Sequence, residues 1–336
     1  LGGASVTNGN GESFVAYLFA SDAGGFGEDE TENIVSCGSY TGNATTPPVI
    51  NLGWEPQWIL FKPATYAEDW TILDVMRGWG AVGAADQVIH PNTTSAESPD
   101  NWMNVTSTGF QPEGSDSHSN QNGVTYIYMA IRRPMKTPES GTEVFMPVLQ
   151  NGGAFVTTGF PVDSFWSAST TLAGYASNVA DRLRGGGNYL DTRSTAAEDV
   201  NATQYLKFDN NTGVTDGLFN PSYPRAYWSF KRAAGFMDVV AYTGTGSYTG
   251  LPHNLTVPPE LFISKARSAT GGWITIYSTS ALGATSRYLS LDTNAASGNW
   301  GDAQFTASTF GLSQVTVGVT YVNYLFATLA GVSNLF

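Results

Sequence analysis

The chain has 336 residues and a formal net charge of −13, and 41% of its residues are hydrophobic. This length and composition allow a sizeable buried core and, at about 100–150 residues per domain, predict two to four units. Charged residues make up only 13%, about half the usual ~25%, which is typical of extracellular or virion β proteins. The negative charge would repel a phosphate backbone, so we expect no nucleic-acid binding.

Two further features limit the class of protein. No run approaches about 18 consecutive apolar residues and no basic-then-apolar signal segment is present, so the sequence predicts neither membrane insertion nor an export signal. Cys37 is the single cysteine, which excludes an intrachain disulfide. We expect it to be a small buried hydrophobic residue.

The first recognisable element, "SFVAYLFASDAGG" (13–25), nearly repeats "VTYVNYLFATLAG" (319–331) near the other end. Such self-similarity is the signature of tandem units. We therefore expect residues 1–25 to be the last strand of a preceding unit plus a linker, so that the chain is a slice of a longer array.

The linker that follows is acidic and rich in glycine. Its carboxylates could supply oxygen ligands for calcium, although the spacing does not match the twelve-residue helix-loop pattern, and a solvated linker is the better interpretation. The weak metal candidates are Asp22, Glu28, Asp29 and Glu30. The sequence predicts no cofactor.

A first unit is expected at 33–133, because part of it recurs without a gap. "EPQWILFKPATYAEDWTILD" (55–74) matches "PPELFISKARSATGGWITIY" (258–277), with equivalent residues 203 positions apart. The pair Trp70 and Trp273 is expected in the core, and the pair Lys62 and Lys265 is expected to be solvated at strand ends, where lysine protects an edge.

Two more units follow, a divergent one at 143–232 and a third at 236–327, with residues 328–336 starting the next linker. "NYLDTRSTAAE" (188–198) matches "RYLSLDTNAAS" (287–297) and, more loosely, "QVIHPNTTSAE" (87–97). A strand-like ending recurs in every unit and is marked by four tyrosines: Tyr17, Tyr126, Tyr227 and Tyr321.

Short aromatic and β-branched runs, separated by Gly, Asn, Ser and Pro, predict antiparallel strands. "ASNVADRLRG" (176–185) is at best a short helix. We expect an all-β fold of tandem antiparallel β-sandwich or jelly-roll-like units of about 95–105 residues.

No reaction can be assigned from local motifs. The residues His90, His118 and His253 lack zinc spacing, and neither a nucleophile elbow nor a phosphate-binding loop is present. We therefore expect a protein that is not an enzyme, and name no catalytic residue. Tryptophans beside turns are weak candidates for glycan stacking, although such rings more often pack against a domain; they are Trp54, Trp79, Trp102 and Trp300.

Several phrases together resemble the repeat segments of tail-fibre-like virion proteins of tailed bacteriophages, with marine phages the most similar. They include "AYLFASDAGGFGEDETENIVSCGSYTGN", "VINLGWEPQWILFK", "DWTILDVMRG" and "YLFATLAGVSN". The resemblance runs from about Ser13 to the end of the chain. It implies a virion structural protein with no assigned reaction, and commonly a homotrimer.

The expected function is that of a virion appendage, in which a repeated β rod contacts other virion proteins and projects or provides binding to a host-surface glycan or receptor. Repetition would let avidity replace affinity. The alternatives are a cellular adhesin or lectin array, a spacer without a ligand and, less expected, a polysaccharide depolymerase, because paired carboxylates cannot be recognised in sequence.

Overall fold

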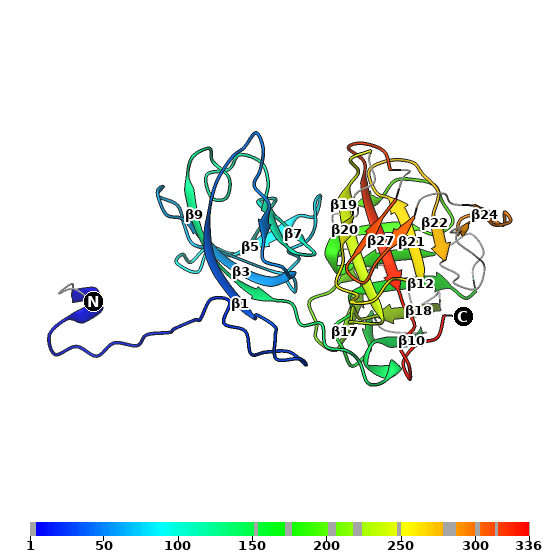
Figure 1. The fold of residues 1–336 in the computed structure, drawn as a ribbon, viewed down its shortest axis with the longest axis horizontal. Helices are drawn as coiled ribbons and strands as arrows, with labels where there is room; N and C mark the ends of the chain where they lie inside the picture. The colour runs from blue at the N-terminus through cyan, green and yellow to red at the C-terminus, as the bar shows by residue number, and fades with distance from the viewer. Residues whose placement is uncertain are drawn as a thin grey trace.

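The computed structural model describes residues 5–150, 154–171, 177–200, 206–217, 224–246, 250–277, 287–299, 303–312 and 315–335 (Figure 1). Strands dominate, and every recorded strand pair is antiparallel, which confirms the all-β prediction. The described helical segments are one turn of α-helix and two short 3-10 turns: α1 (Ser5–Asn8), η1 (Gly141–Glu143) and η2 (Arg182–Arg184). In this described part no helix is long and apolar enough to cross a membrane.

Unit 1 consists of a larger sheet, a smaller sheet and a strand pair. The larger sheet has the order β1 (Val35–Thr41), β9 (Thr125–Arg132), β3 (Pro56–Pro63), β4 (Thr71–Asp74). The smaller sheet has the order β2 (Ile50–Asn51), β8 (Gly109–Pro112), β7 (Met103–Thr106). The pair is β5 (Asp86–Val88) with β6 (Ser98–Asp100).

Unit 2 repeats this plan with a longer main sheet. Its order is β10 (Phe145–Gln150), β18 (Arg225–Phe230), β12 (Ser164–Ser169), β13 (Asn178–Asp181), β14 (Asn188–Asp191), β15 (Asp199–Val200). The smaller sheet has the order β11 (Phe155–Thr157), β17 (Gly213–Asp216), β16 (Leu206–Lys207).

Unit 3 has the same arrangement again. The main sheet runs β19 (Met237–Thr243), β27 (Thr320–Phe326), β21 (Leu261–Ala266), β22 (Ile274–Tyr277), β23 (Arg287–Ser290), β24 (Gly298–Asn299). The smaller sheet runs β20 (Leu251–Pro252), β26 (Thr309–Gly311), β25 (Gln304–Phe305). Each predicted unit range thus holds one set of two sheets.

In all three units the last strand lies between the first and the third, so β9, β18 and β27 are each the second strand of their sheet. The period of two along a strand decides which side chains enter the core. In β3, for example, Ile59 and Phe61 are fully buried, whereas Leu60 and Lys62 between them point to the other face and are half-buried. The smaller sheet covers the inner face and completes a sandwich.

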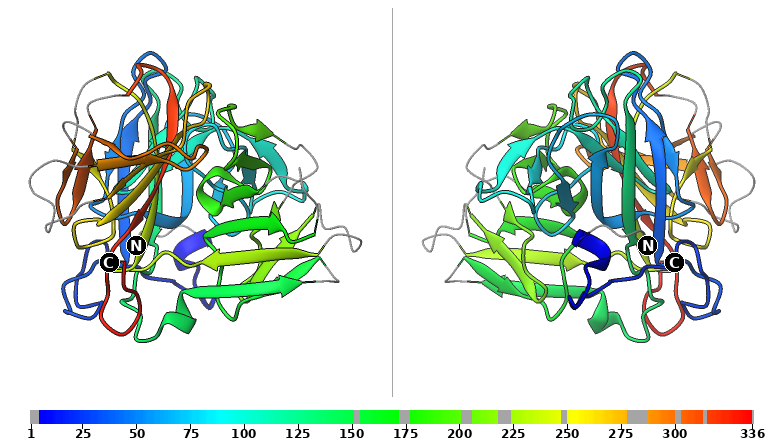
Figure 2. Two further views of the ribbon diagram at one scale, coloured as in Figure 1. Left: turned by 90° about the vertical axis from the view of Figure 1, so that its right-hand side faces the viewer. Right: turned by 90° about the vertical axis from the view of Figure 1, so that its left-hand side faces the viewer.

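The units do not line up end to end as a rod. Unit 1 contacts unit 2 through the backbone bond from Ala81 N to Leu183 O (2.8 Å), and unit 3 through the bond from Ser107 Oγ to Pro252 O (2.8 Å). One hydrophobic cluster contains buried residues of all three units. In the end-on views of Figure 2, unit 2 (green) lies to one side of the overlapping units 1 and 3. The described chain is therefore a compact block of three sandwiches.

Units 2 and 3 pack against each other through the outer faces of their main sheets. Figure 1 shows β10, β12 and β18 crossing β19, β21 and β27 steeply, as in orthogonal sheet packing. Aromatic rings fill the contact: Phe230 lies 5.7 Å from Phe326, and Trp166 lies 5.6 Å from Tyr324, between ring centroids.

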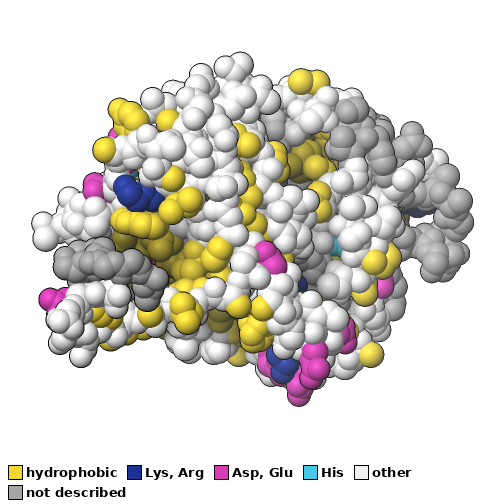
Figure 3. All heavy atoms as spheres, turned by 60° about the vertical axis from the view of Figure 1, so that its left-hand side comes forward, with side chains coloured by type: hydrophobic (Ala, Val, Ile, Leu, Met, Phe, Trp, Pro, Cys, Tyr) yellow, Lys and Arg dark blue, Asp and Glu magenta, His cyan; other side chains and the backbone are white. Residues whose placement is uncertain are grey.

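The N-terminal segment does not form the sandwich strand that its sequence match to β27 predicts. Residues 13–20 form no strand in the described chain and leave apolar side chains exposed, with Tyr17 83% and Leu18 93% accessible. Figure 3 shows hydrophobic side chains gathered on the side of the molecule from which this segment extends. The equivalent strand β27 is buried because two neighbouring strands flank it.

Four sequence expectations need correction. Cys37 is exposed, because it points outward from β1 on an open sheet face. Lys265 is 1% accessible, and Lys62 is half-buried, so neither is a fully solvated edge residue. Over the described residues 177–185, the expected short helix is instead β13 followed by the 3-10 turn η2. Of the expected core pair, Trp273 is buried, but Trp70 is only half-buried.

Candidate functional site

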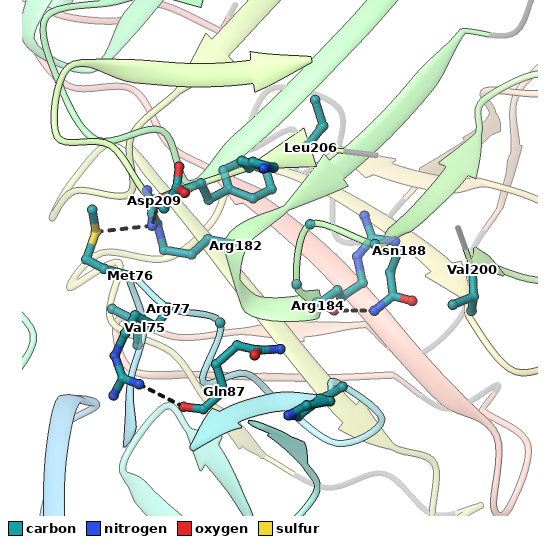
Figure 4. A pocket seen from close by; sticks show the side chains of 18 of the residues that line it. Val75, Met76, Arg77, Gln87, Arg182, Arg184, Asn188, Val200, Leu206 and Asp209 are labelled. Atoms are coloured by element: carbon teal, nitrogen blue, oxygen red, sulfur yellow. Dashed lines mark hydrogen bonds between the residues drawn. The ribbon is translucent and has the colours of Figure 1, made fainter. Parts of the chain in front are cut away.

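The chain makes the same turn in units 1 and 2, and both turns line one cleft (Figure 4). In each, an aspartate that ends a strand accepts hydrogen bonds from the arginine three residues later. Asp74 accepts from the backbone N (2.9 Å) and Nε (2.6 Å) of Arg77. Asp181 accepts from the same two atoms of Arg184, also at 2.9 and 2.6 Å. The glycine after each arginine has a positive φ, which ordinary side chains disfavour.

Each arginine also binds a glutamate from a later loop. Arg77 Nη1 lies 3.2 Å from Glu97 Oε2, and Arg184 Nη1 lies 2.6 Å from Glu198 Oε2. These pairs agree with the sequence match between 87–97 and 188–198. They differ in environment, because the Glu97 side chain is 40% exposed and that of Glu198 is 9% exposed.

The cleft between these turns has a volume of about 710 Å³. Unit 1 contributes residues around Arg77 together with Gln87 and Glu97, and unit 2 contributes 182–188 and 206–209. Apolar side chains also line it: Val75, Met76, Pro99, Val200, Leu206 and Phe208. It therefore combines an apolar lining with charged groups, as small-ligand sites do.

Arg182 holds the two sides of the cleft together. Its guanidinium donates to the carbonyl oxygens of Val162 (2.7 Å) and Phe208 and to Asp163 Oδ1 (3.3 Å), and it contacts the sulfur of Met76 in unit 1 at 3.2 Å. Burial lowers the pKa of Arg182, although Asp163 opposes this shift. Because these partners occupy its guanidinium, Arg182 stabilises the wall of the cleft rather than binding a ligand.

Asp163 is the centre of a buried ionic network beneath the cleft. Burial alone would raise its pKa, but Arg133, Arg182 and Arg232 together outweigh burial and leave the pKa lowered. Arg133 Nη2 lies 2.7 Å from Asp163 Oδ2. The carboxylate is therefore charged and fully engaged at neutral pH.

Other groups at the cleft are accessible to a ligand. Lys207 and Asp209 are exposed beside Glu97, and in the part of the chain that the structure describes Lys207 has no recorded hydrogen-bond or ion-pair partner. Gly186 packs directly against Leu206: its carbonyl accepts from Leu206 N (2.7 Å), and a Cβ at Gly186 would lie 1.7 Å from Leu206 O, so only glycine fits there. The ammonium and carboxylate groups suit a ligand with many hydroxyl groups.

A second cavity of about 670 Å³ lies in unit 3. The described residues that line it carry hydroxyl and amide groups but no charge, and they include Thr270, Tyr288, Asn299 and Tyr321. Because it lacks charged groups and belongs to a single unit, we regard the cleft between units as the better candidate.

The tryptophans expected to stack on a glycan lie elsewhere. Trp54, Trp79 and Trp102 are only 4%, 0% and 8% accessible, and Trp79 Nε1 donates to Met103 O at 2.8 Å inside unit 1. These rings present no free face to a sugar, because the ends of the sandwich close over them. Trp300 lies outside the described residues.

The acidic linker does not gather its carboxylates. Asp22 accepts hydrogen bonds from Ser21 (2.9 Å) and Ser36 (3.1 Å), whereas Glu28, Asp29 and Glu30 are exposed along the linker. Among the residues with described positions, no group of three or more His, Cys, Asp or Glu side chains is placed to hold a metal ion.

Two histidines distant in sequence meet in unit 1. The rings of His90 and His118 lie 5.6 Å apart, and His118 stacks on Trp102 at 4.3 Å. His118 also contacts Glu68 Oε2 (3.1 Å) and Asp116 Oδ1 (2.8 Å). Sequence spacing could not show this cluster, because the loops that carry it converge only in the fold.

The cleft, in contrast, has a signal in the sequence. "DVMRG" (74–78) and "DRLRG" (181–185) share the pattern Asp-x-x-Arg-Gly, and each precedes one of the matched segments that carry Glu97 and Glu198. Aligning these short patterns would have paired the two turns. It would not have placed them at one cleft.

Comparison with known proteins identifies a family but no function. No curated protein and no solved structure matches this chain significantly. A family model described as "Domain of unknown function (DUF7483)" matches residues 1–134 and 225–335, which include units 1 and 3 and leave out most of the divergent unit 2. Because the match covers more than half of the chain, the protein belongs to the DUF7483 family.

Proposed function

We propose that this chain is a structural part of a phage virion appendage, of the tail-fibre kind, and that it binds a host-surface glycan at the cleft between units 1 and 2. Its partners would be other virion proteins and the host envelope, and its place the extracellular particle. The three sandwiches would act as one rigid block that holds the cleft in a fixed orientation.

The observation that carries the proposal is the cleft itself. Two repeat units supply equivalent Asp-x-x-Arg-Gly turns to it, and exposed Lys207, Asp209 and Glu97 lie at its edge. Fixed hydrogen-bonding groups around an apolar floor are suited to a polar ligand of limited size. Recognition would depend on hydrogen bonds and ion pairs, since the aromatic residue in its lining, Phe208, is 6% accessible.

The phage assignment has a separate basis. It rests on the resemblance of the quoted sequence phrases to tail-fibre-like virion proteins, and the low share of charged residues in the sequence, 13%, is compatible with it. A cellular adhesin would share these properties, so host binding and virion origin need separate tests. Antibodies raised against the chain should label the tail region of intact phage particles, and labelling confined to a cell surface would contradict the virion assignment.

The cleft is tested by binding to immobilised envelope polysaccharides of candidate hosts, with wild-type protein and two variants. Lys207→Ala should weaken binding about tenfold, because it removes a charged hydrogen-bond donor worth about 1.5 kcal/mol. Lys136→Ala is the matched control, since Lys136 is also exposed but pairs with Glu139 far from the cleft lining.

Equal affinity of the wild type and the Lys207→Ala variant would remove the cleft from the proposal. If the protein bound no host cell and no envelope glycan, it would be a spacer without a ligand. Release of oligosaccharide during incubation would instead indicate a depolymerase, which the proposed binding role does not include.

A further inference from the structure

Unit 1 has an open apolar face on its larger sheet. The residues that alternate outward from β1, β9, β3 and β4 form neighbouring rows by strand register, for example Cys37, Met129, Leu60 and Ile72. We call this surface the unit 1 face; it comprises Cys37, Trp58, Leu60, Lys62, Ile72, Ile127, Met129 and Ile131. Its members are exposed or half-buried, and Ile127 is 39% accessible.

The same face is covered in unit 3. Val239, Ile263 and Tyr324 occupy the positions of Cys37, Leu60 and Met129, and they are 1%, 8% and 0% accessible. Unit 2 covers them with the outward residues of its own main sheet, chiefly Trp166 and Phe230. Of three equivalent sheets, those of units 2 and 3 pack on each other, with Trp228 of unit 2 left 37% accessible, and that of unit 1 has no partner in the described chain.

One contact between units 2 and 3 joins equivalent positions of the two units. Phe230 and Phe326 stand at the same place in their units, since each ends the central strand, and their rings lie 5.7 Å apart. Ile131 holds this position in unit 1. Contact between equivalent positions is what an isologous twofold interface requires, so one such face can pack on another.

A loop contact accompanies this packing. Lys265 Nζ of unit 3 donates to the carbonyls of Thr195 (3.0 Å) and Ala196 (2.7 Å) in unit 2, and Trp273 Nε1 donates to Asp191 O (2.9 Å). The loop has a defined shape, in which Ser194 N bonds Asp191 O at 3.2 Å.

Unit 1 carries both halves of this loop contact. Lys62 and Trp70 stand at the positions of Lys265 and Trp273 but are half-buried, because no other unit packs on them in the described residues. Its own loop 90–97 repeats the same turn, with Thr93 N bonded to His90 O at 3.1 Å. Unit 1 therefore carries both the donors, Lys62 and Trp70, and a loop whose carbonyls could accept them. In the described chain no second unit is in place to complete either half of the contact.

We propose that the unit 1 face binds the unit 1 face of a second copy of this chain. In the resulting twofold dimer the two Ile131 side chains lie near the axis, and loop 90–97 of each copy receives Lys62 and Trp70 of the other. Dimerisation through this face requires no glycan. The dimer would bring two clefts onto one particle and so raise avidity.

The test measures the mass of the purified chain by analytical ultracentrifugation over a range of concentrations. The wild type should form a dimer of twice 35.8 kDa. Ile127→Arg should raise the dimer dissociation constant by about a hundredfold or more, because each interface would bury two unpaired charges. Leu149→Arg is the matched control: Leu149 is a strand residue of unit 2, is 65% accessible, and should leave the dimer unchanged.

Cys37 provides an independent readout that does not depend on a substitution in the face. Because Cys37 is the single cysteine, the rate at which a maleimide labels the chain measures how accessible the unit 1 face is. Labelling should slow as the wild type dimerises, but not in the Ile127→Arg variant. A monomer at all concentrations, or an oligomer that Ile127→Arg leaves intact, would overturn the proposal. A monomer at all concentrations would instead favour another repeat unit of a longer chain as the partner that packs on the unit 1 face.

Discussion

At the scale of single residues, sequence-equivalent positions have different environments. Lys62 and Lys265 match in the repeat, and each donates to a carbonyl of its own hairpin, Glu68 and Gly271. Only Lys265 also reaches two carbonyls of a neighbouring unit and becomes 1% accessible. Burial lowers the pKa of Lys265, with Asp292 opposing the shift. The neighbouring unit, and not the local sequence, determines how much each lysine contributes to stability.

The two lysines provide a matched test of this difference. Lys265→Met should reduce the free energy of unfolding by about 2–4 kcal/mol, because it leaves buried carbonyls without a donor. Lys62→Met should cost less than about 1 kcal/mol, since its surroundings are half solvated. Urea denaturation followed by tryptophan fluorescence measures both, and equal losses would contradict the assigned role of the unit 2 loop.

At the scale of elements, the connection after β20 is held by a neutral histidine. His253 Nδ1 accepts from Leu255 N (3.1 Å), and its Nε2 lies 3.1 Å from Thr306 O, which requires a proton on Nε2. Burial lowers the pKa of His253, although Asp238 and carbonyl groups partly oppose it. This connection also joins unit 3 to unit 1 through Asn254 and Ser107.

The lowered pKa predicts a loss of stability in mild acid. Below about pH 6.5 the unfolded chain takes up a proton that folded His253 resists, so the free energy of unfolding should fall as the pH drops toward the folded pKa. Above that pH both states are neutral and the group contributes no slope. His253→Gln should flatten the decline between about pH 7 and 5.5 in urea titrations, and an unchanged slope would place its origin in other groups.

At the scale of the whole molecule, a buried ionic network joins the three units. Arg232, at the end of unit 2, bonds Glu55 of unit 1 at 2.5 and 2.8 Å and Asp238 of unit 3 at 2.6 Å. Its side chain is 4% exposed. We expect the block to unfold as one cooperative body, because each unit shares its core and its charges with the others.

Removing this arginine should test the joining role. Arg232→Met removes the ion-pair partner of buried Asp238 and leaves Glu55 with only Arg133, at 3.7 Å, so it should cost about 3–5 kcal/mol. Arg193→Met removes an ion pair with Asp191 at a side chain that is 44% exposed, and should change stability by less than about 0.5 kcal/mol. Calorimetry should also show the single wild-type transition broaden or split in the Arg232 variant, and a shift no larger than in the control would contradict the proposed coupling.

The sequence by itself determined the all-β class, the repeated plan and the equivalence of the matched segments, because strand periodicity and turn residues are local properties. The tertiary structure decided which copies touch. It packed units 2 and 3 face to face, left Cys37 exposed, buried Trp54, Trp79 and Trp102, and placed two distant turns at one cleft. Most of these contacts between units join residues 69 to 185 positions apart, and no local pattern records which of several equivalent faces will be covered.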